Sequence, residues 1–139
     1  MRKVLRWLLE VPDLVQVFQK DFEAEPGKAT LSGYSDANWA SERSTGRKST
    51  SGGVIYLNGN CIKTYSRLQP IVALSSAESE LFAMVEMARE LIGLGQLISH
   101  VFDHVTSPLD LATDSASARQ VSMMSGFLRR MRQDRKSVV

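Results

Sequence analysis

The chain has 139 residues, of which 43% are hydrophobic and 23% are charged, a composition typical of one globular domain and too short for two. Its 17 lysines and arginines against 15 acids give a formal charge of +2, which is too small to indicate nucleic-acid binding by itself. The single cysteine, Cys61, excludes an internal disulfide and a cysteine-rich zinc site, and it favours a reducing intracellular compartment, cytoplasm or nucleus alike.

The first predicted element is a short helix that ends at Pro12, followed by an extended stretch from Leu14 to Phe18. A polar segment containing Pro26-Gly27 is typical of a linker. We therefore predict three parts: a leading segment (1–20), a linker (21–29) and the main domain (30–139). No run approaches the ~18 consecutive apolar residues of a membrane span, so we expect no membrane partner.

The main domain begins with three predicted strands. Leu31 to Trp39 forms the first, and a polar loop leads to the second, Val54 to Leu57. Asn58-Gly59 follows, a dipeptide that readily adopts the positive φ of a tight hairpin turn, so Cys61 to Tyr65 should pair antiparallel with the second strand.

A long helix is predicted from Ser76 to Asp103, then a strand from Leu109 to Thr113 and a short helix from Ser115 to Met123. The last segment, 126–139, is a further helix candidate. Gly93 and Gly95 are places where the long helix could bend. Its apolar stripe is predicted to hold Leu81, Val85, Ala88 and Ile92. Further apolar residues widen this stripe, so that much of the helix should be buried: Phe82, Met84, Leu91, Leu94, Ile98 and Val101.

The order of these elements places three acids at one edge of the sheet. A strand–helix–strand crossover makes the last strand parallel to the first in one mixed sheet. The carboxyl ends of those two strands and the start of the long helix then share an edge, where open α/β sheets bind ligands. The acids at these three places are Asp36, Glu78 and Asp114.

Such a group of carboxylates predicts a metal site. The charges repel one another unless a cation lies among them, and oxygen ligands without histidine or cysteine suit Mg²⁺ or Mn²⁺. Two such ions ~3.5–4 Å apart can activate a water for phosphodiester hydrolysis. Each acid taken alone has a structural alternative: a turn for Asp36, a capping box with Ser75 for Glu78, and a helix N-cap for Asp114.

Four motifs, GYSDANWA, GRKSTSGGVIYL, QPIVALSSAESELFAM and TDSASA, resemble in order the ribonuclease H region of copia-type retrotransposon Pol polyproteins. The leading VLRWLLEVPDLVQVF resembles the segment that joins reverse transcriptase to that region. The resemblance implies a ribonuclease-H-like fold in which Asp36, Glu78 and Asp114 hold two Mg²⁺ or Mn²⁺ ions. It also implies hydrolysis of the RNA strand of RNA–DNA hybrids during reverse transcription, with reverse transcriptase and integrase regions as partners in a parent polyprotein.

The chain departs from the family pattern in several places. Asn38 stands where the family usually has a second acid, and Asp114 is followed by Ser115-Ala116 instead of Asn-Gln. The fourth acid of the family comes from a later strand and helix that the chain is expected to lack, and Asp134 is a minor candidate for that role. The alternative is therefore a catalytically inactive remnant with at most weak nucleic-acid binding.

Substrate contacts are predicted from polar side chains near the same edge. A hybrid-specific nuclease senses 2′-hydroxyls and the shape of the minor groove, and phosphates hold the duplex in register. The same side chains have an alternative role in forming turns. The candidates are Ser35, Arg47, Lys48, Ser49, Ser76 and Ser115.

Overall fold

The computed structural model describes residues 2–11, 13, 15–20, 26–40, 44, 46–103, 105 and 107–123. The predicted helix at 126–139 lies outside these residues. The helices are α1 (Arg2–Glu10), α2 (Ser76–Val101) and α3 (Ala116–Met123). The strands are β1 (Leu31–Asn38), β2 (Thr50–Leu57), β3 (Asn60–Leu68) and β4 (Leu109–Thr113).

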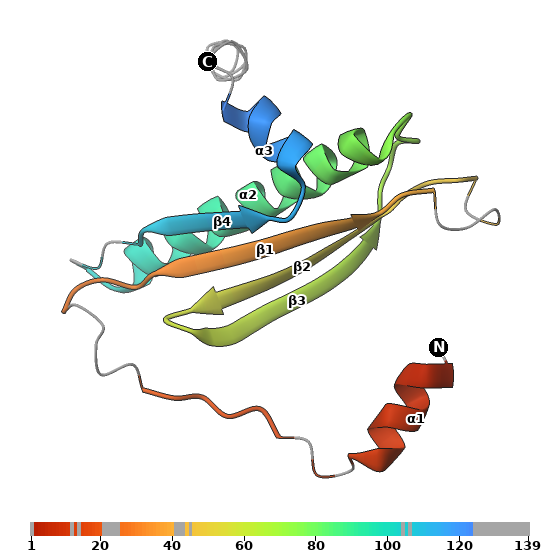
Figure 1. Cartoon of the computed structure of the whole chain (residues 1–139). Coiled ribbons are helices and arrows are strands. Elements are labelled where there is room, and N and C mark those ends of the chain that lie inside the picture. Colours follow the sequence, from red (N-terminus) through yellow and green to blue (C-terminus); the bar gives the residue numbers. More distant parts are fainter. Residues whose placement is uncertain are drawn as a thin grey trace.

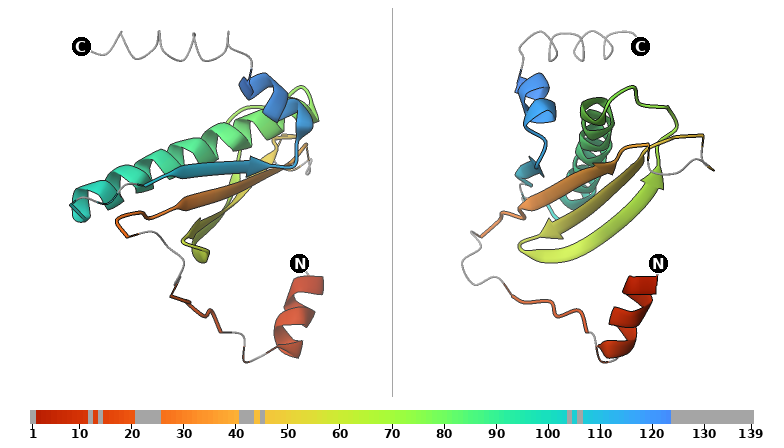
Figure 2. Two further views of the ribbon diagram at one scale, coloured as in Figure 1. Left: turned by 60° about the vertical axis from the view of Figure 1, so that its left-hand side comes forward. Right: turned by 45° about the vertical axis from the view of Figure 1, so that its right-hand side comes forward.

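The described strands form one mixed sheet in the order β3-β2-β1-β4 (Figure 1). β1 and β2 are antiparallel, as are β2 and β3, whereas β4 runs parallel to β1. α2 crosses from the end of β3 to the start of β4 and covers one face of the sheet (Figure 2). The predicted α/β architecture with a parallel fourth strand is confirmed.

The β2–β3 hairpin turns at Asn58-Gly59, as predicted. Both residues have positive φ, 47° and 77°, which asparagine and glycine adopt more readily than other residues. Both strands are longer than the sequence indicates, because β2 begins at Thr50 and β3 continues to Leu68. Ser51, Gly52 and Gly53 have little intrinsic strand preference, but pairing with β1 on one side and β3 on the other overrides it.

The core lies between the sheet and α2. Leu31 and Ile55 from the sheet pack with Met87 and Leu91 from the helix, and all four are at most 1% exposed. Gly33 lets the helix approach closely, because a Cβ there would lie 2.7 Å from the Met87 sulfur. The core of the fold is therefore built around a methionine that rests directly on the backbone of β1.

The buried face of α2 agrees only in part with the predicted stripe. Ile92 is 41% exposed, and Leu81, Val85 and Ala88 are only half-buried. Met84 and Leu91 are buried as predicted, but the other residues of the widened stripe are half-buried or exposed. Apolar residues lie all around this helix, so periodicity alone does not choose between its faces. The residues that α2 buries are Ser79, Ala83, Met84, Met87, Leu91 and Gly95.

α2 continues through both glycines as one helix. Gly95 is buried, and a Cβ at this position would lie 3.2 Å from the Leu109 side chain, so the glycine makes room for the start of β4. Glycine here serves close packing of a helix against a strand and does not end the helix.

The stretch before the sheet is attached to the hairpin by side-chain hydrogen bonds. Gln16 Nε2 donates to the carbonyl oxygen of Cys61, and the Gln19 N–H donates to Asn60 Oδ1 at 2.7 Å. Asn60 Nδ2 returns a hydrogen bond to the Gln19 carbonyl at 2.8 Å. Residues 15–20 are neither helix nor strand.

Among the described helices, none is both long and apolar enough to cross a membrane.

Candidate metal centre

Three carboxylates from separate elements meet at one edge of the sheet. They belong to Asp36 in β1, Glu80 in α2 and Asp114, directly after β4, and one oxygen of each lies within 4.8 Å of the others. The β1–β4 register explains the meeting of the two aspartates, because Ser35 is the partner of Thr113 and the next residue of each strand is the aspartate. α2 starts at the same edge and supplies the third acid.

Glu80, and not the predicted Glu78, is the glutamate of this group. Glu78 is used at the start of the helix: its N–H donates to Ser75 Oγ at 3.1 Å, and its Oε2 accepts from the Leu74 N–H at 2.7 Å. Successive helical residues are about 100° apart, so two glutamates separated by one residue point in widely different directions. The prediction of Glu78 in the acidic group is therefore corrected to Glu80, while Asp36 and Asp114 lie where the sequence places them.

The environment of Glu80 disfavours its charged form. Burial raises the pKa of its carboxyl, and the negative charges of Asp36 and Asp114 raise it further, against a lowering by a hydrogen bond that the Ala37 N–H donates. Glu80 Oε2 is buried without a hydrogen-bond partner in the described part of the chain. A buried carboxylate oxygen without a hydrogen-bond partner destabilises the fold. Carboxylates in such unfavourable surroundings are common in functional sites.

This donor set fits a hard divalent cation. All three ligand candidates are carboxylates, and the group contains no histidine or thiol. Mg²⁺ and Mn²⁺ prefer oxygen ligands of this kind, and a cation among the three oxygens would offset both their mutual repulsion and the desolvation of Glu80. Asp36, Glu80 and Asp114 are hereafter called the acidic rim.

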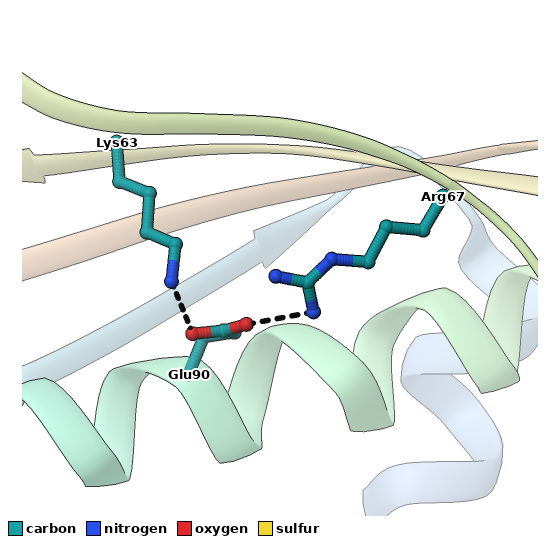
Figure 3. A network of polar contacts seen from close by, with 3 residues as sticks. All are labelled: Lys63, Arg67 and Glu90. Carbon is teal, nitrogen blue, oxygen red and sulfur yellow. Dashed lines mark hydrogen bonds and ion pairs between the residues drawn. The ribbon is translucent and has the colours of Figure 1, made fainter.

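A second carboxylate of α2 is neutralised instead. Glu90 forms ion pairs with two basic side chains of β3 (Figure 3). Its Oε2 lies 2.6 Å from Lys63 Nζ, and its Oε1 lies 2.9 Å from Arg67 Nη1. The pKa of Glu90 is lowered, chiefly by the hydrogen bond from Lys63. Burial raises this pKa, but the hydrogen bond from Arg67 and the positive charges of Lys63 and Arg67 lower it further. The Arg67 guanidinium also lies 4.8 Å from the centre of the Tyr65 ring.

Two of the predicted substrate contacts are incompatible with the structure. Ser49 is fully buried, and its hydroxyl accepts a hydrogen bond from the Ala40 N–H at 3.3 Å. Ser35 is 6% exposed, and its hydroxyl oxygen is buried without a hydrogen-bond partner in the described part of the chain. Both predictions are corrected, because a hydroxyl that is enclosed by protein cannot meet a nucleic acid at the surface.

The other four predicted contacts lie at or near the surface. Arg47 and Ser76 are exposed, and Lys48 is half-buried. Ser115 is half-buried, and its hydroxyl accepts the Ala118 N–H at 3.2 Å, as an N-cap of α3 does. Contact of these four residues with a substrate stays a prediction. Asp134, the minor candidate for a fourth acid, lies outside the described residues.

Two known proteins are similar to the chain. It is 40% identical over 94 residues to secreted RxLR effector protein 161 of Plasmopara viticola, a match that covers 68% of the chain and 62% of the effector. It is 34% identical over 97 residues to the retrovirus-related Pol polyprotein from transposon TNT 1-94 of Nicotiana tabacum, which covers 70% of the chain but 7% of the polyprotein. The chain thus spans less than two thirds of either relative, and the second match supports a retrotransposon-related origin.

No protein-family model and no solved structure matches the chain.

Proposed function

We propose that the chain is a ribonuclease-H-like domain that hydrolyses the RNA strand of RNA–DNA hybrids with the help of two divalent metal ions, Mg²⁺ or Mn²⁺. The observation that carries this proposal is the acidic rim, in which three carboxylates from separate elements approach within 4.8 Å at the carboxyl edge of a mixed sheet. The retrotransposon-related origin supports the choice of substrate, because reverse transcription of such an element produces RNA–DNA hybrids.

Each acid has a distinct part in the proposed site. Asp36 lies in β1 and Asp114 directly follows β4, so the pairing of Ser35 with Thr113 brings the two aspartates to the same edge. Glu80 comes from the helix, and its raised pKa couples cation binding to loss of its proton. Bound divalent ions supply an activated water and stabilise the leaving oxygen in phosphodiester hydrolysis. Cation affinity should therefore increase with pH as Glu80 ionises.

The second candidate function is a non-catalytic one, in which the same domain binds nucleic acid weakly or serves another role. The observation that favours it is the match to a secreted effector, which has the higher identity of the two relatives. The two candidates differ in whether the carboxylates of the acidic rim are required for a chemical step.

Two glutamates on the same helix provide a matched test. Purified chain is incubated with an RNA–DNA hybrid carrying a labelled RNA strand, in Mg²⁺ and separately in Mn²⁺, with duplex DNA as a substrate control. We expect Glu80→Gln to reduce the cleavage rate by about 100-fold or more, equivalent to about 2.7 kcal/mol of transition-state stabilisation. Glu78→Gln should cleave nearly as well as wild type, because glutamine also serves in a capping box.

The outcomes of this experiment decide between the two candidate functions. A wild-type chain that leaves the hybrid intact in both metals, although folded, supports the non-catalytic candidate. Loss of cleavage in Glu78→Gln with retention in Glu80→Gln would show that the acidic rim is wrongly assigned.

A further inference from the structure

Gln69 is a polar side chain that is buried next to the acidic rim. It follows β3 directly, is 1% exposed, and lies in the connection that leads to α2. Its Nε2 uses both of its hydrogens, donating to Ser51 Oγ at 3.0 Å and to the carbonyl oxygen of Ser79 at 2.9 Å. Its backbone N–H donates to the Ser49 carbonyl at 2.8 Å. One residue thus joins the end of β3, the start of β2 and α2.

The partners of Gln69 are neighbours of the acids. Ser51 is the pairing partner of Ala37, the residue after Asp36 in β1. Ser79 immediately precedes Glu80 and is itself fully buried. The Gln69 carboxamide thus links β2, which pairs with the strand that carries Asp36, to the residue next to Glu80 in α2.

A second tie acts on the same connection from the other side. Trp39 Nε1, just beyond the end of β1, donates to the Ala73 carbonyl at 3.1 Å, close to the N-cap of α2. Side-chain hydrogen bonds thus hold the connection before α2 at Ala73 and the first turn of α2 at Ser79. Repulsion between Glu80 and the two aspartates acts to separate these elements, so the ties oppose it.

We propose that Gln69 is a positioning residue of the acidic rim, and that its two donated hydrogen bonds hold Glu80 against Asp36. This inference rests on the proposed function for its purpose, since it names what keeps the cation ligands together. An amide is the side chain that suits the place, because it offers two donors in one plane to a hydroxyl and a carbonyl. A glutamate at the same position would turn an acceptor towards the Ser79 carbonyl.

The Gln69 Oε1 atom supports a role beyond packing. It is buried without a hydrogen-bond partner in the described part of the chain. An apolar residue of the same shape would avoid that unmade bond, so filling space alone does not account for a glutamine. Groups that orient metal ligands typically change metal affinity by 10–100-fold when they are removed.

The test compares Gln69→Met, which keeps the volume and removes both hydrogen bonds, with Ser51→Ala, which removes one. Ile55→Val in the core is the control for loss of stability without a change at the rim, and circular dichroism confirms that every variant is folded at the working temperature. Titration calorimetry with Mn²⁺ is expected to give a Kd increased at least tenfold in Gln69→Met, about threefold in Ser51→Ala and unchanged in Ile55→Val. In hybrid cleavage, kcat should fall with the hybrid KM unchanged.

A metal-free measurement keeps the inference separate from the proposed function. The Ala37 N–H donates to the Glu80 carboxylate, so wild type should show a nuclear Overhauser effect between the Ala37 amide and the Glu80 side chain. Gln69→Met should lose this contact and Ile55→Val should keep it. Retention of the contact and of wild-type Mn²⁺ affinity in Gln69→Met would overturn the positioning role. If wild type shows the contact but binds no Mn²⁺, the proposed function is overturned. The positioning role is then decided by whether Gln69→Met loses the contact between the Ala37 amide and the Glu80 side chain.

Discussion

Two glutamates of α2 have opposite surroundings. Glu90 lies between Lys63 and Arg67, and its pKa is lowered, whereas Glu80 lies between Asp36 and Asp114, and its pKa is raised (Figure 3 for Glu90). The helix, the residue type and the sheet beneath are shared, so the difference comes from neighbouring charge and burial. A neutralised carboxylate contributes to holding α2 on β3, whereas a carboxylate kept among like charges destabilises the fold and indicates a site for a cation.

The largest expected effect is a metal-dependent stabilisation of the folded protein that requires Glu80 and does not require Glu90. At a metal concentration 100 times Kd, a ligand that binds only the folded state adds about 2.7 kcal/mol to the free energy of unfolding. We expect a rise in melting temperature with Mg²⁺ or Mn²⁺ in wild type and Glu90→Gln, measured by differential scanning fluorimetry against EDTA. Glu80→Gln should show no rise, and an equal rise in that variant would remove the distinction between the two glutamates.

A smaller effect is expected from breaking the Glu90 pairs. The side chains of Lys63 and Arg67 are 36% and 50% exposed, so solvent screening limits their contribution. Glu90→Gln should lower the free energy of unfolding by about 0.5–1 kcal/mol at neutral pH and low salt. Because the folded pKa is lowered, this stabilisation is present above the ordinary carboxyl pKa and is lost as the pH falls through the folded value.

Urea unfolding at pH 7 and in strong acid, with and without high salt, measures this contribution. A difference between wild type and Glu90→Gln that is the same in acid and in high salt would contradict an electrostatic origin.

The smallest effect has the opposite sign. In the absence of metal, Glu80→Gln should raise the urea midpoint at neutral pH, because the raised pKa means that ionised Glu80 destabilises the folded state. That destabilisation is absent below the ordinary carboxyl pKa and complete above the raised one, so the two proteins should unfold alike in acid. Urea titrations in EDTA across this range provide the measurement. A variant less stable than wild type at pH 7 would contradict the destabilisation of ionised Glu80 by burial and by the two aspartates.

Local signals in the sequence were sufficient for much of the fold. Asn58-Gly59 predicts its hairpin because few residues adopt two successive positive φ angles, and the strand Leu109–Thr113 has the predicted bounds. The place of Asp36 and Asp114 also follows, since the crossover rule fixes the direction of β4 relative to β1.

The glutamate of the site required geometry that motif spacing does not contain. Glu78 and Glu80 lie at the start of the same helix, and only the rotation of α2 about its axis decides which of them faces Asp36. The capping box with Ser75 was the available signal, because a side chain engaged in a cap is not free to serve as a ligand. Gln69 gave no such signal, since its partners Ser51 and Ser79 become its neighbours only in the folded sheet.

The parallel pairing of β1 with β4 also governs when the rim can assemble during synthesis. A ribosome releases β1, the hairpin and α2 before β4, so Asp36 and Glu80 emerge well ahead of Asp114. Up to that moment the nascent sheet has β1 as its outer strand and carries an incomplete set of carboxylates. Full assembly is thus a late event of biogenesis, set by the docking of a five-residue strand.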